Sequence, residues 1–483
     1  MLFNSLSFAL FLPVVFVLYW FVAGKSLKYQ NVLLLCASYF FYACWDWRFL
    51  FLLVFSTLLD YVTGIKMSGA GSAKARKFWF WLSVIVNLGF LGVFKYFNFF
   101  AASMAIAMAN IGLHVNPWTL KVILPVGISF YTFHGLSYVI DIYKNRIKAE
   151  RNFIDYSLFV SFFPLLVAGP IERATHLLPQ VKKVRTFDYY MAADGLRQIL
   201  WGLFKKAVIA DQCSEFANVI FANSSGYTGS TLVLGALFFT FQIYCDFSGY
   251  SDMALGIARL FGIDLLRNFA FPYFSRDIAE FWRRWHISLS SWFRDYLYIP
   301  LGGSKGGTWT KVRNTFIIFL VSGFWHGANW TFITWGLLNA LYIMPLIIFN
   351  KNRVNLQIVA QGRALPSLWE FFQILLTFSL TVFAWIFFRA TSMSHAFSYI
   401  GRIFSKSLFT VPQFDASRVM VFETVILIIV FIIIEWSGRE SQYAIASLAR
   451  FKRKSYRYAF YFSLILMIYL FMGREQQFIY FQF

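Results

Sequence analysis

Two histidines of this sequence are candidates for chemistry. His326 lies inside a charge-free run, 314–350, that is apolar enough to enter a membrane. Counted from Asn314 at about 1.5 Å per residue, it lies roughly 18 Å deep, near the middle of a hydrocarbon core about 30 Å thick. An ionisable group at that depth is costly, so it indicates a functional site.

The chemistry that suits His326 is proton abstraction. A histidine can take a proton from a hydroxyl group near neutral pH, which makes His326 the candidate general base of a group transfer. The alternative is a neutral ring that is hydrogen-bonded to a neighbouring helix. Gly323, Gly327 and Ala328 leave space beside the ring, either for a substrate or for a closely packed helix.

The second histidine, His286, lies between arginines in the segment 281–296. Read as one helix, this segment has an aromatic stripe and a second face that carries Arg283, His286, Ser290 and Arg294. A polar ring inside such a cationic face is compatible with a role next to a charged substrate.

A cationic face of this kind suits a phosphate-rich ligand such as coenzyme A, because guanidinium groups bind phosphate through paired hydrogen bonds. We therefore predict a coenzyme A site at Arg283, Arg284 and Arg294. The alternative is a membrane-surface helix anchored by its Trp residues. That alternative explains the aromatic stripe, but it explains a histidine between arginines less well.

The remaining polar clusters carry weaker signals. Residues 244–252 contain two carboxylates with no histidine at ligand spacing, so we expect helix capping or the lining of a polar cavity rather than a metal site. The Gly-rich stretch 300–307 lacks the spacing of a P-loop. His134 is expected to be structural, and no metal site is predicted.

The elements that position these residues must be membrane helices. Of the 483 residues, 59% are hydrophobic and 13% are charged, which is too little polar surface to cover a water-soluble globule. The net charge of +21 would suggest nucleic acid in a soluble protein, but in a membrane protein it reflects basic cytoplasmic loops. The composition indicates a multi-pass membrane protein and excludes a nucleic-acid-binding one.

The basic clusters between the apolar runs predict the topology. When every cluster is placed in the cytoplasm, the runs alternate almost consistently as spans. The run 156–171 has basic clusters on both sides and contains Pro164 and a Gly-Pro pair, so we expect a re-entrant segment. The aromatic and basic stretch 246–313 is expected to form interfacial helices on the cytoplasmic face. No linker divides the chain, so we expect a single domain over 1–483.

Six motifs resemble those of one protein family. They are PVGISFYTFHGLSYVIDIY at 125–143, FPLLVAGPIER at 163–173, YCDFSGYSDMALG at 244–256, FWRRWHISLSSWFRDYLYIPLGG at 281–303, FWHGANW at 324–330 and FIYFQF at 478–483. On these motifs the chain resembles the membrane-bound O-acyltransferase (MBOAT) family, and within it the bacterial alginate O-acetyltransferase branch. The motifs are spread over most of the chain, and the fourth is long enough to be highly specific.

The resemblance implies a fold, a donor and a route. The fold would be an all-α bundle of about 11–13 transmembrane helices with re-entrant segments and a central channel, with core motifs over 120–350 and C-terminal helices over 365–483. An acetyl group would pass from cytoplasmic acetyl-coenzyme A through the bacterial inner membrane to an acceptor outside. In this branch a periplasmic SGNH-type partner often completes the transfer to the polysaccharide, and lipids surround the enzyme.

The resemblance also implies roles for the two histidines. His326 matches the family's central histidine, and His286 matches a second polar position that is His or Asn in different members. We expect His326 to activate an attacking hydroxyl, and His286 to orient the donor or to stabilise developing charge. An acetyl-His326 intermediate is an alternative version of the same transfer.

The acceptor stays open at this point. An alginate-like exopolysaccharide is expected, but acetylation of peptidoglycan or cellulose and D-alanyl transfer use related proteins. The motifs FIYFQF and AGPIER favour the alginate-like branch over D-alanyl transfer. A polysaccharide export channel or flippase is a different class that would need a lined cavity, but it would not need a histidine deep in the membrane.

Overall fold

The structure is a computed structural model of the whole chain. It describes residues 1–483 except 25, 117, 121–122, 415–416, 451–452, 473–475, 477 and 480–483. The described residues form helices, turns and loops without a β-strand, which confirms the all-helical fold. They group into two compact units, residues 1–192 with 257–266 and residues 193–256 with 267–483. The expectation of one functional domain stays a prediction.

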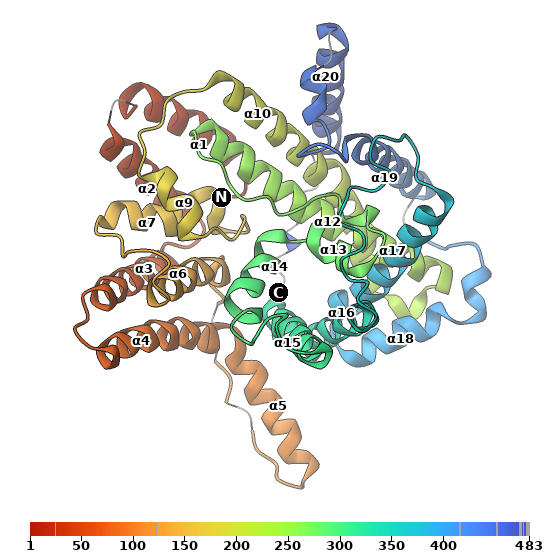
Figure 1. Cartoon of the computed structure of the whole chain (residues 1–483). Helices are drawn as coiled ribbons and strands as arrows, with labels where there is room; N and C mark the ends of the chain where they lie inside the picture. Colours follow the sequence, from red (N-terminus) through yellow and green to blue (C-terminus); the bar gives the residue numbers. More distant parts are fainter. Residues whose placement is uncertain are drawn as a thin grey trace. The chain divides into compact units, whose positions relative to one another are not determined.

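The first unit contains the N-terminal helices, coloured red to yellow in Figure 1. They are α1 (Leu6–Val17), α2 (Leu27–Ala43), α3 (Trp47–Ser68), α4 (Ala73–Leu91), α5 (Phe97–Asn110), α6 (Ile128–Tyr143), α7 (Phe153–Ser161), α8 (Phe163–Leu166) and α9 (Ala174–Val181). His134 is fully buried in α6, where its Nε2 accepts the backbone N–H of Glu172 at 3.1 Å. This hydrogen bond joins α6 to the loop before α9, as the structural role predicted for His134 requires.

The segment 156–171 does not form a membrane-crossing helix. It folds into the end of α7 and the one-turn helix α8, which are separated by the extended residue Phe162. The 9 residues of α7 extend only about 14 Å, half of what a hydrocarbon core requires. The predicted interruption is confirmed, because α7 ends at Ser161 and Pro164 lies in the first turn of a separate helix, α8. The re-entrant path in a bilayer stays a prediction.

The second unit contains the central and C-terminal helices. They are α10 (Tyr189–Phe204, from Ala193), α11 (Asp211–Ala222), α12 (Gly229–Leu260, to Gly256), α13 (Ile278–Arg284), α14 (Ile287–Phe293), α15 (Thr308–His326), α16 (Trp330–Ile348), α17 (Leu368–Arg389), α18 (Met393–Ile403), α19 (Arg418–Gly438) and α20 (Lys454–Phe471). A π-helical segment, Lys205–Ala210, joins α10 to α11.

Six helical stretches of the described chain are long and apolar enough to cross a membrane. They are Trp47–Ser68, Ala73–Asn110, Gly229–Leu260, Trp330–Ile348, Leu368–Arg389 and Arg418–Gly438. The protein is therefore a multi-pass membrane protein, as its composition predicts. The larger number of spans that the resemblance implies stays a prediction.

The charge-free run 314–350 folds as a helical hairpin rather than as one span. α15 ends at His326, and α16 begins four residues later beside it (Figure 1). Two glycines allow the close approach: a Cβ on Gly323 would lie 2.3 Å from the carbonyl oxygen of Phe332, and one on Gly336 would lie 2.3 Å from that of Phe319. Small residues at such crossings let membrane helices approach each other closely.

The segment 281–296 is not one continuous helix, so the expected shared face does not exist. α13 ends at Arg284, Trp285 is extended, and His286 adopts left-handed backbone angles (φ 43°, ψ 54°) before α14 begins. The aromatic side chains of this segment pack inward, and the break turns α14 away from the axis of α13. The side chains of Arg283 and His286 therefore point to different places.

Candidate active site

His326 occupies the C-terminal end of α15, in the turn that leads to α16. Its Nδ1 lies 2.6 Å from the carbonyl oxygen of Ser322. Because a carbonyl oxygen only accepts hydrogen bonds, Nδ1 carries the proton of the neutral ring and the lone pair lies on Nε2. This is the tautomer that a general base acting through Nε2 requires.

Aromatic side chains surround the buried ring of His326. Trp325 lies 4.7 Å away between ring centroids, Trp335 lies 5.0 Å away and Phe388 lies 5.5 Å away. These residues come from α15, α16 and α17, so three helices fix the position of one imidazole. An apolar shell of this kind lowers the local dielectric and strengthens every charge interaction at the ring.

The small residues next to His326 serve packing. A Cβ on Gly327 would lie 2.1 Å from the ring of Phe332, and Gly323 lies at the crossing of α15 and α16. Of the two uses expected for this space, a substrate or a close helix, the structure shows the close helix and a neighbouring ring.

His286 lies at the break between α13 and α14, with 1% of its surface exposed. Its ring packs edge-on against Phe247 of α12 at 4.7 Å, and neither ring nitrogen has a hydrogen-bond partner among the described residues. Burial lowers the pKa of His286 well below its ordinary value, with His326 as a lesser cause, so the ring is neutral. A neutral imidazole with unused nitrogens can donate one hydrogen bond and accept another.

Trp325 links the two histidines. Its ring lies 4.7 Å from that of His326 and 6.2 Å from that of His286. Residues 40 positions apart in the sequence thus meet at one aromatic side chain. The structure brings together the two histidines that the sequence singles out.

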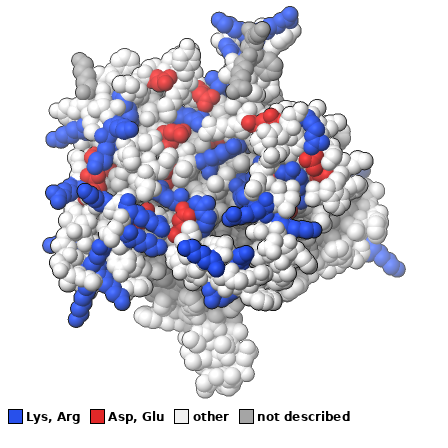
Figure 2. Space-filling model, viewed as in Figure 1, with Lys and Arg blue, Asp and Glu red and all other residues white. Residues whose placement is uncertain are grey.

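A cavity of 440 Å³ lies beside α13, and it is lined by four arginines. They are Arg267, Arg283, Arg284 and Arg439. The carboxylates of Glu280 and Glu440 also line it, so the formal charge of the lining is positive. Figure 2 shows Lys and Arg spread over the face in view, with fewer Asp and Glu among them. A positive cavity suits an anionic ligand.

The predicted arginines separate into two groups. Arg283 and Arg284 line the cavity, together with Arg267 and Arg439, which the sequence did not single out. Arg294 instead pairs with its neighbour Asp295 at 2.7 Å and is not among the residues that line the cavity. The physical reason is the break at His286, which places α14 on a different course from α13.

Buried ion pairs form a further polar cluster that sequence reasoning missed. α12 continues through residues 244–252 and carries Asp246. Lys206, in the segment before α11, lies 2.9 Å from Asp246 and 2.8 Å from Asp211. Lys205 lies 2.6 Å from Asp252 and, with Tyr244, lines a small polar cavity. The expected lining of a polar cavity by 244–252 is therefore found. The lysine partners of its carboxylates were not predicted, and the signal that could have indicated them is a pair of lysines in an apolar context.

Among the described residues, no group of three or more His, Cys, Asp or Glu side chains is arranged to hold a metal ion. The site consists of two buried histidines, their aromatic shell and a basic cavity. An imidazole can donate or accept a proton and a basic cavity can bind an anion, so these groups are compatible with acid–base catalysis on an anionic substrate.

Comparison with known proteins identifies the family of the chain. The profile of the membrane-bound O-acyltransferase family, MBOAT, matches residues 143–390. The protein named "Probable alginate O-acetylase AlgI" of Pseudomonas putida is 40% identical over 447 residues, which are 92% of this chain and 88% of that protein. The chain belongs to this family.

Other relatives of this acyltransferase act on different polymers by their names. The "Peptidoglycan O-acetyltransferase" of Helicobacter pylori is 36% identical over 82% of this chain and 78% of its own length. The "Teichoic acid D-alanyltransferase" of Bacillus subtilis is 27% identical over 56% of this chain and 70% of its own length. These findings confirm the resemblance and the enzyme class, because each of these relatives transfers an acyl group by name.

The family match includes most of the residues discussed above. His286, His326, Arg283 and Arg284 all lie within 143–390. The motif at 478–483 lies outside the match, and its residues 480–483 also lie outside the described residues.

Proposed function

We propose that this acyltransferase takes an acetyl group from cytoplasmic acetyl-coenzyme A and passes it through the bacterial inner membrane for O-acetylation of an alginate-like exopolysaccharide. The pair of buried histidines around Trp325 carries the proposal. Similarity to proteins named alginate O-acetylase over 92% of the chain supports the acetyl group and the polysaccharide. A periplasmic SGNH-type partner is proposed to present the acceptor hydroxyl or to complete the transfer.

His326 acts as the general base in the proposed reaction. Its Nε2 takes the proton of the attacking hydroxyl while the hydroxyl oxygen forms a bond to the thioester carbonyl carbon. The carbon–sulfur bond breaks, and the coenzyme A thiolate leaves and takes up the proton. No proton is gained or lost overall, so the ring returns to the tautomer that its bond to Ser322 favours.

His286 is proposed to stabilise the oxygen on which negative charge develops. A neutral N–H donor in an apolar site needs no solvent reorganisation when the charge appears, and one such donor contributes about 10²–10³ in rate. The ring nitrogens without hydrogen-bond partners support this role. A buried polar side chain without a partner lowers the stability of the fold, and a function in catalysis is a reason to retain it.

The donor's phosphates are proposed to bind in the arginine-lined cavity beside α13. Coenzyme A carries a diphosphate and a further phosphate, and guanidinium groups bind phosphate better than ammonium groups do. Arg283 and Arg284 line the cavity. The role expected for Arg294 stays a prediction.

The test is acetyl transfer from labelled acetyl-coenzyme A by purified protein in liposomes, with the partner and candidate polymers supplied. Wild type and His326→Ala are compared at equal amounts of folded protein. Label that moves only with His326 present supports the transferase and its base. Label that moves equally in both variants overturns the catalytic assignment.

Peptidoglycan is the second candidate acceptor. A peptidoglycan O-acetyltransferase is 36% identical over most of the chain, only slightly less than the alginate O-acetylases. The D-alanyl transferases are less similar and match only about half of this chain. Supplying alginate-like polymer and peptidoglycan fragments in parallel, each with its partner, distinguishes the two.

A further inference from the structure

A loop of the chain itself accepts hydrogen bonds from arginines of the proposed donor cavity. The loop is residues 351–359, which follow α16, and we call it the strap. Arg283 donates from Nη1 to the carbonyl oxygen of Asn352 at 2.9 Å and from Nη2 to that of Asn355 at 2.8 Å. The carbonyl oxygens of the strap thus take up both ends of one guanidinium fork, the geometry that a phosphate group would use.

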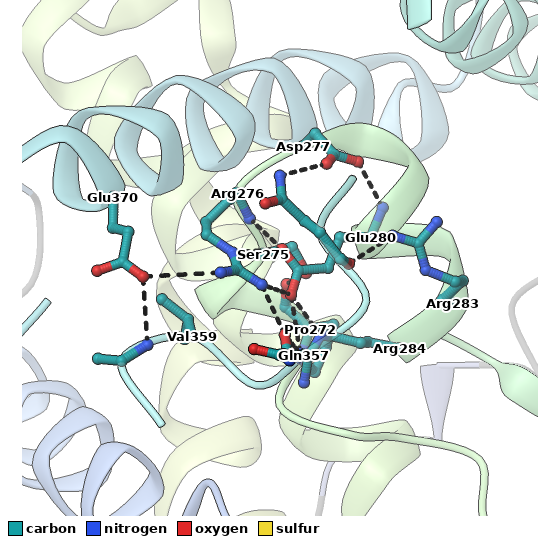
Figure 3. A network of polar contacts seen from close by, with 12 residues as sticks. Pro272, Ser275, Arg276, Asp277, Glu280, Arg283, Arg284, Gln357, Val359 and Glu370 are labelled. Carbon is teal, nitrogen blue, oxygen red and sulfur yellow. Dashed lines mark hydrogen bonds and ion pairs between the residues drawn. The ribbon is translucent and has the colours of Figure 1, made fainter. Parts of the chain in front are cut away.

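Two more arginines bind the strap farther along. The carbonyl oxygen of Gln357 accepts from Arg276 Nη2 at 2.6 Å and from Arg284 Nη2 at 3.3 Å (Figure 3). One side-chain contact adds to these, since the amide of Asn355 donates to Asp277 at 2.7 Å. Three arginines therefore converge on three carbonyl oxygens of one short loop.

The strap also forms part of the wall of the cavity. Asn355, Leu356 and Ile358 line the same 440 Å³ as Arg283 and Arg284. That volume is near the small end of the range of roughly 300–1,000 Å³ for small-molecule sites, and coenzyme A is larger than most such ligands.

The residues that flank the strap on both sides have left-handed backbone angles. Asn350, just before it, has φ 53°, and Ala360, just after it, has φ 46°. Asn350 is the left-handed residue that commonly ends a helix, here α16, whereas such angles are rare for a residue like Ala360. The C-terminal end of the strap is held in place, because Arg439 donates to the carbonyl oxygens of Val359, its last residue, and of Ala360.

We propose that the carbonyl oxygens of the strap stand in for the donor's phosphate oxygens, and that the strap must leave Arg283 and Arg284, the two of these arginines that line the cavity, before the donor binds them. This proposal rests on the proposed function, because it takes acetyl-coenzyme A as the donor. It makes donor binding a competition within the chain. The closed strap excludes the donor, and the donor's phosphates hold the strap open.

Competition between the strap and the donor predicts opposite effects on donor affinity for a variant in the strap and a variant in the arginines. Asn355→Ala removes the bond to Asp277 and loosens the strap, so the affinity for a nucleotide donor rises by up to about tenfold. Arg283→Ala removes a phosphate-binding group, so the affinity falls by about tenfold or more. If Arg283 served only to hold the loop, the two variants would shift the affinity in the same direction.

The probe is desulfo-coenzyme A, which carries the phosphates but no thiol, and its binding is measured by calorimetry on the full-length protein in detergent. Arg313→Ala is the matched control, because Arg313 also donates to a backbone carbonyl, that of Leu301, but does not line the cavity. Its affinity is expected to equal that of wild type. Affinity that falls with Asn355→Ala overturns the competition.

A second measurement locks the strap. In Asp277→Cys/Asn355→Cys, a short reversible thiol cross-linker joins the strap to the start of α13, and each single variant controls for its own substitution. The linked protein is expected to lose binding at least tenfold, and cleavage of the linker is expected to restore it. Binding that persists in the linked protein refutes the strap alone. Absence of binding in wild type and all variants refutes the donor, and with it the proposed function.

Discussion

The bare nitrogens of His286 lead to a prediction that separates function from stability. Replacing His286 by Leu removes no hydrogen bond to a described residue. Leucine in the left-handed conformation costs about 1–2 kcal/mol. That cost is offset because two buried polar atoms without partners, worth about 1–3 kcal/mol each, disappear. We therefore expect His286→Leu to be at least as stable as wild type.

The same substitution is expected to abolish most of the transfer. If His286 supplies one hydrogen bond to the developing oxyanion, its loss lowers the rate by about 10²–10³, or roughly 2.7–4 kcal/mol of activation free energy. His286→Asn retains an N–H donor and tolerates left-handed backbone angles, so it is expected to keep a larger share of the rate. The rate order is therefore wild type, then Asn, then Leu.

His134 provides the matched control, because it is equally buried but fully used. His134→Leu leaves the backbone N–H of Glu172 without its acceptor, which costs about 1–3 kcal/mol. The assays are the apparent melting temperature in detergent and the initial rate of label transfer per folded molecule. We expect a lower melting temperature for His134→Leu and a lower rate for His286→Leu. A melting temperature that falls as far in His286→Leu, with an unchanged rate per folded molecule, would refute the reasoning.

Three shorter predictions follow from single contacts. His326→Gln is expected to lower the initial rate of acetyl transfer by about 10²–10⁴, because it removes the base, and a smaller loss would contradict that role. Lys206→Met leaves two buried carboxylates without their cation, so the free energy of unfolding should fall by about 3–5 kcal/mol, read as a lower melting temperature that a second change, Asp246→Asn, partly restores. The hydrogen bond to Glu172 raises the pKa of His176. The stability from this pair is thus complete below about pH 6.5 and is lost as the pH rises through the raised pKa, so His176→Ala should lower the melting temperature at pH 6 and not at pH 8.5.

The sequence singles out the two histidines because each is unusual within its own segment, whatever the fold. An ionisable residue within an apolar run is anomalous wherever the chain folds, and His326 stood out on that ground, whereas His286 stood out as a histidine between arginines. The all-helical membrane class followed in the same way from composition. The pairing of the two rings at Trp325 is a tertiary contact, and no periodicity in either segment encodes it.

The hydrogen bonds of the strap and the carboxylate partners of the buried lysines were not predicted, and the reason is different for each. Arg276, Arg283 and Arg284 bind backbone carbonyl oxygens, and every residue has one, so the sequence of the strap contains no signal for its partners. Lys205 pairs with Asp252, 47 positions away, and Lys206 pairs with Asp246, 40 positions away, so neither segment by itself indicates these pairs. Long-range polar pairs of this kind are visible only after folding.

The sequence inference of one continuous helix, which the structure overturns, bears on how the proposed donor would bind. A continuous helix over 281–296 would place Arg283 and His286 on one face, so that phosphate binding and chemistry would have to share a surface. The left-handed backbone at His286 breaks the helix, and the guanidinium of Arg283 then lies at the cavity while the imidazole packs against Phe247. A ligand as long as acetyl-coenzyme A has its phosphates and its thioester at opposite ends. A broken helix can bind the two ends in two environments, a polar one for the phosphates and an aromatic one for the acyl group, whereas a straight helix of the same sequence would hold both groups in one.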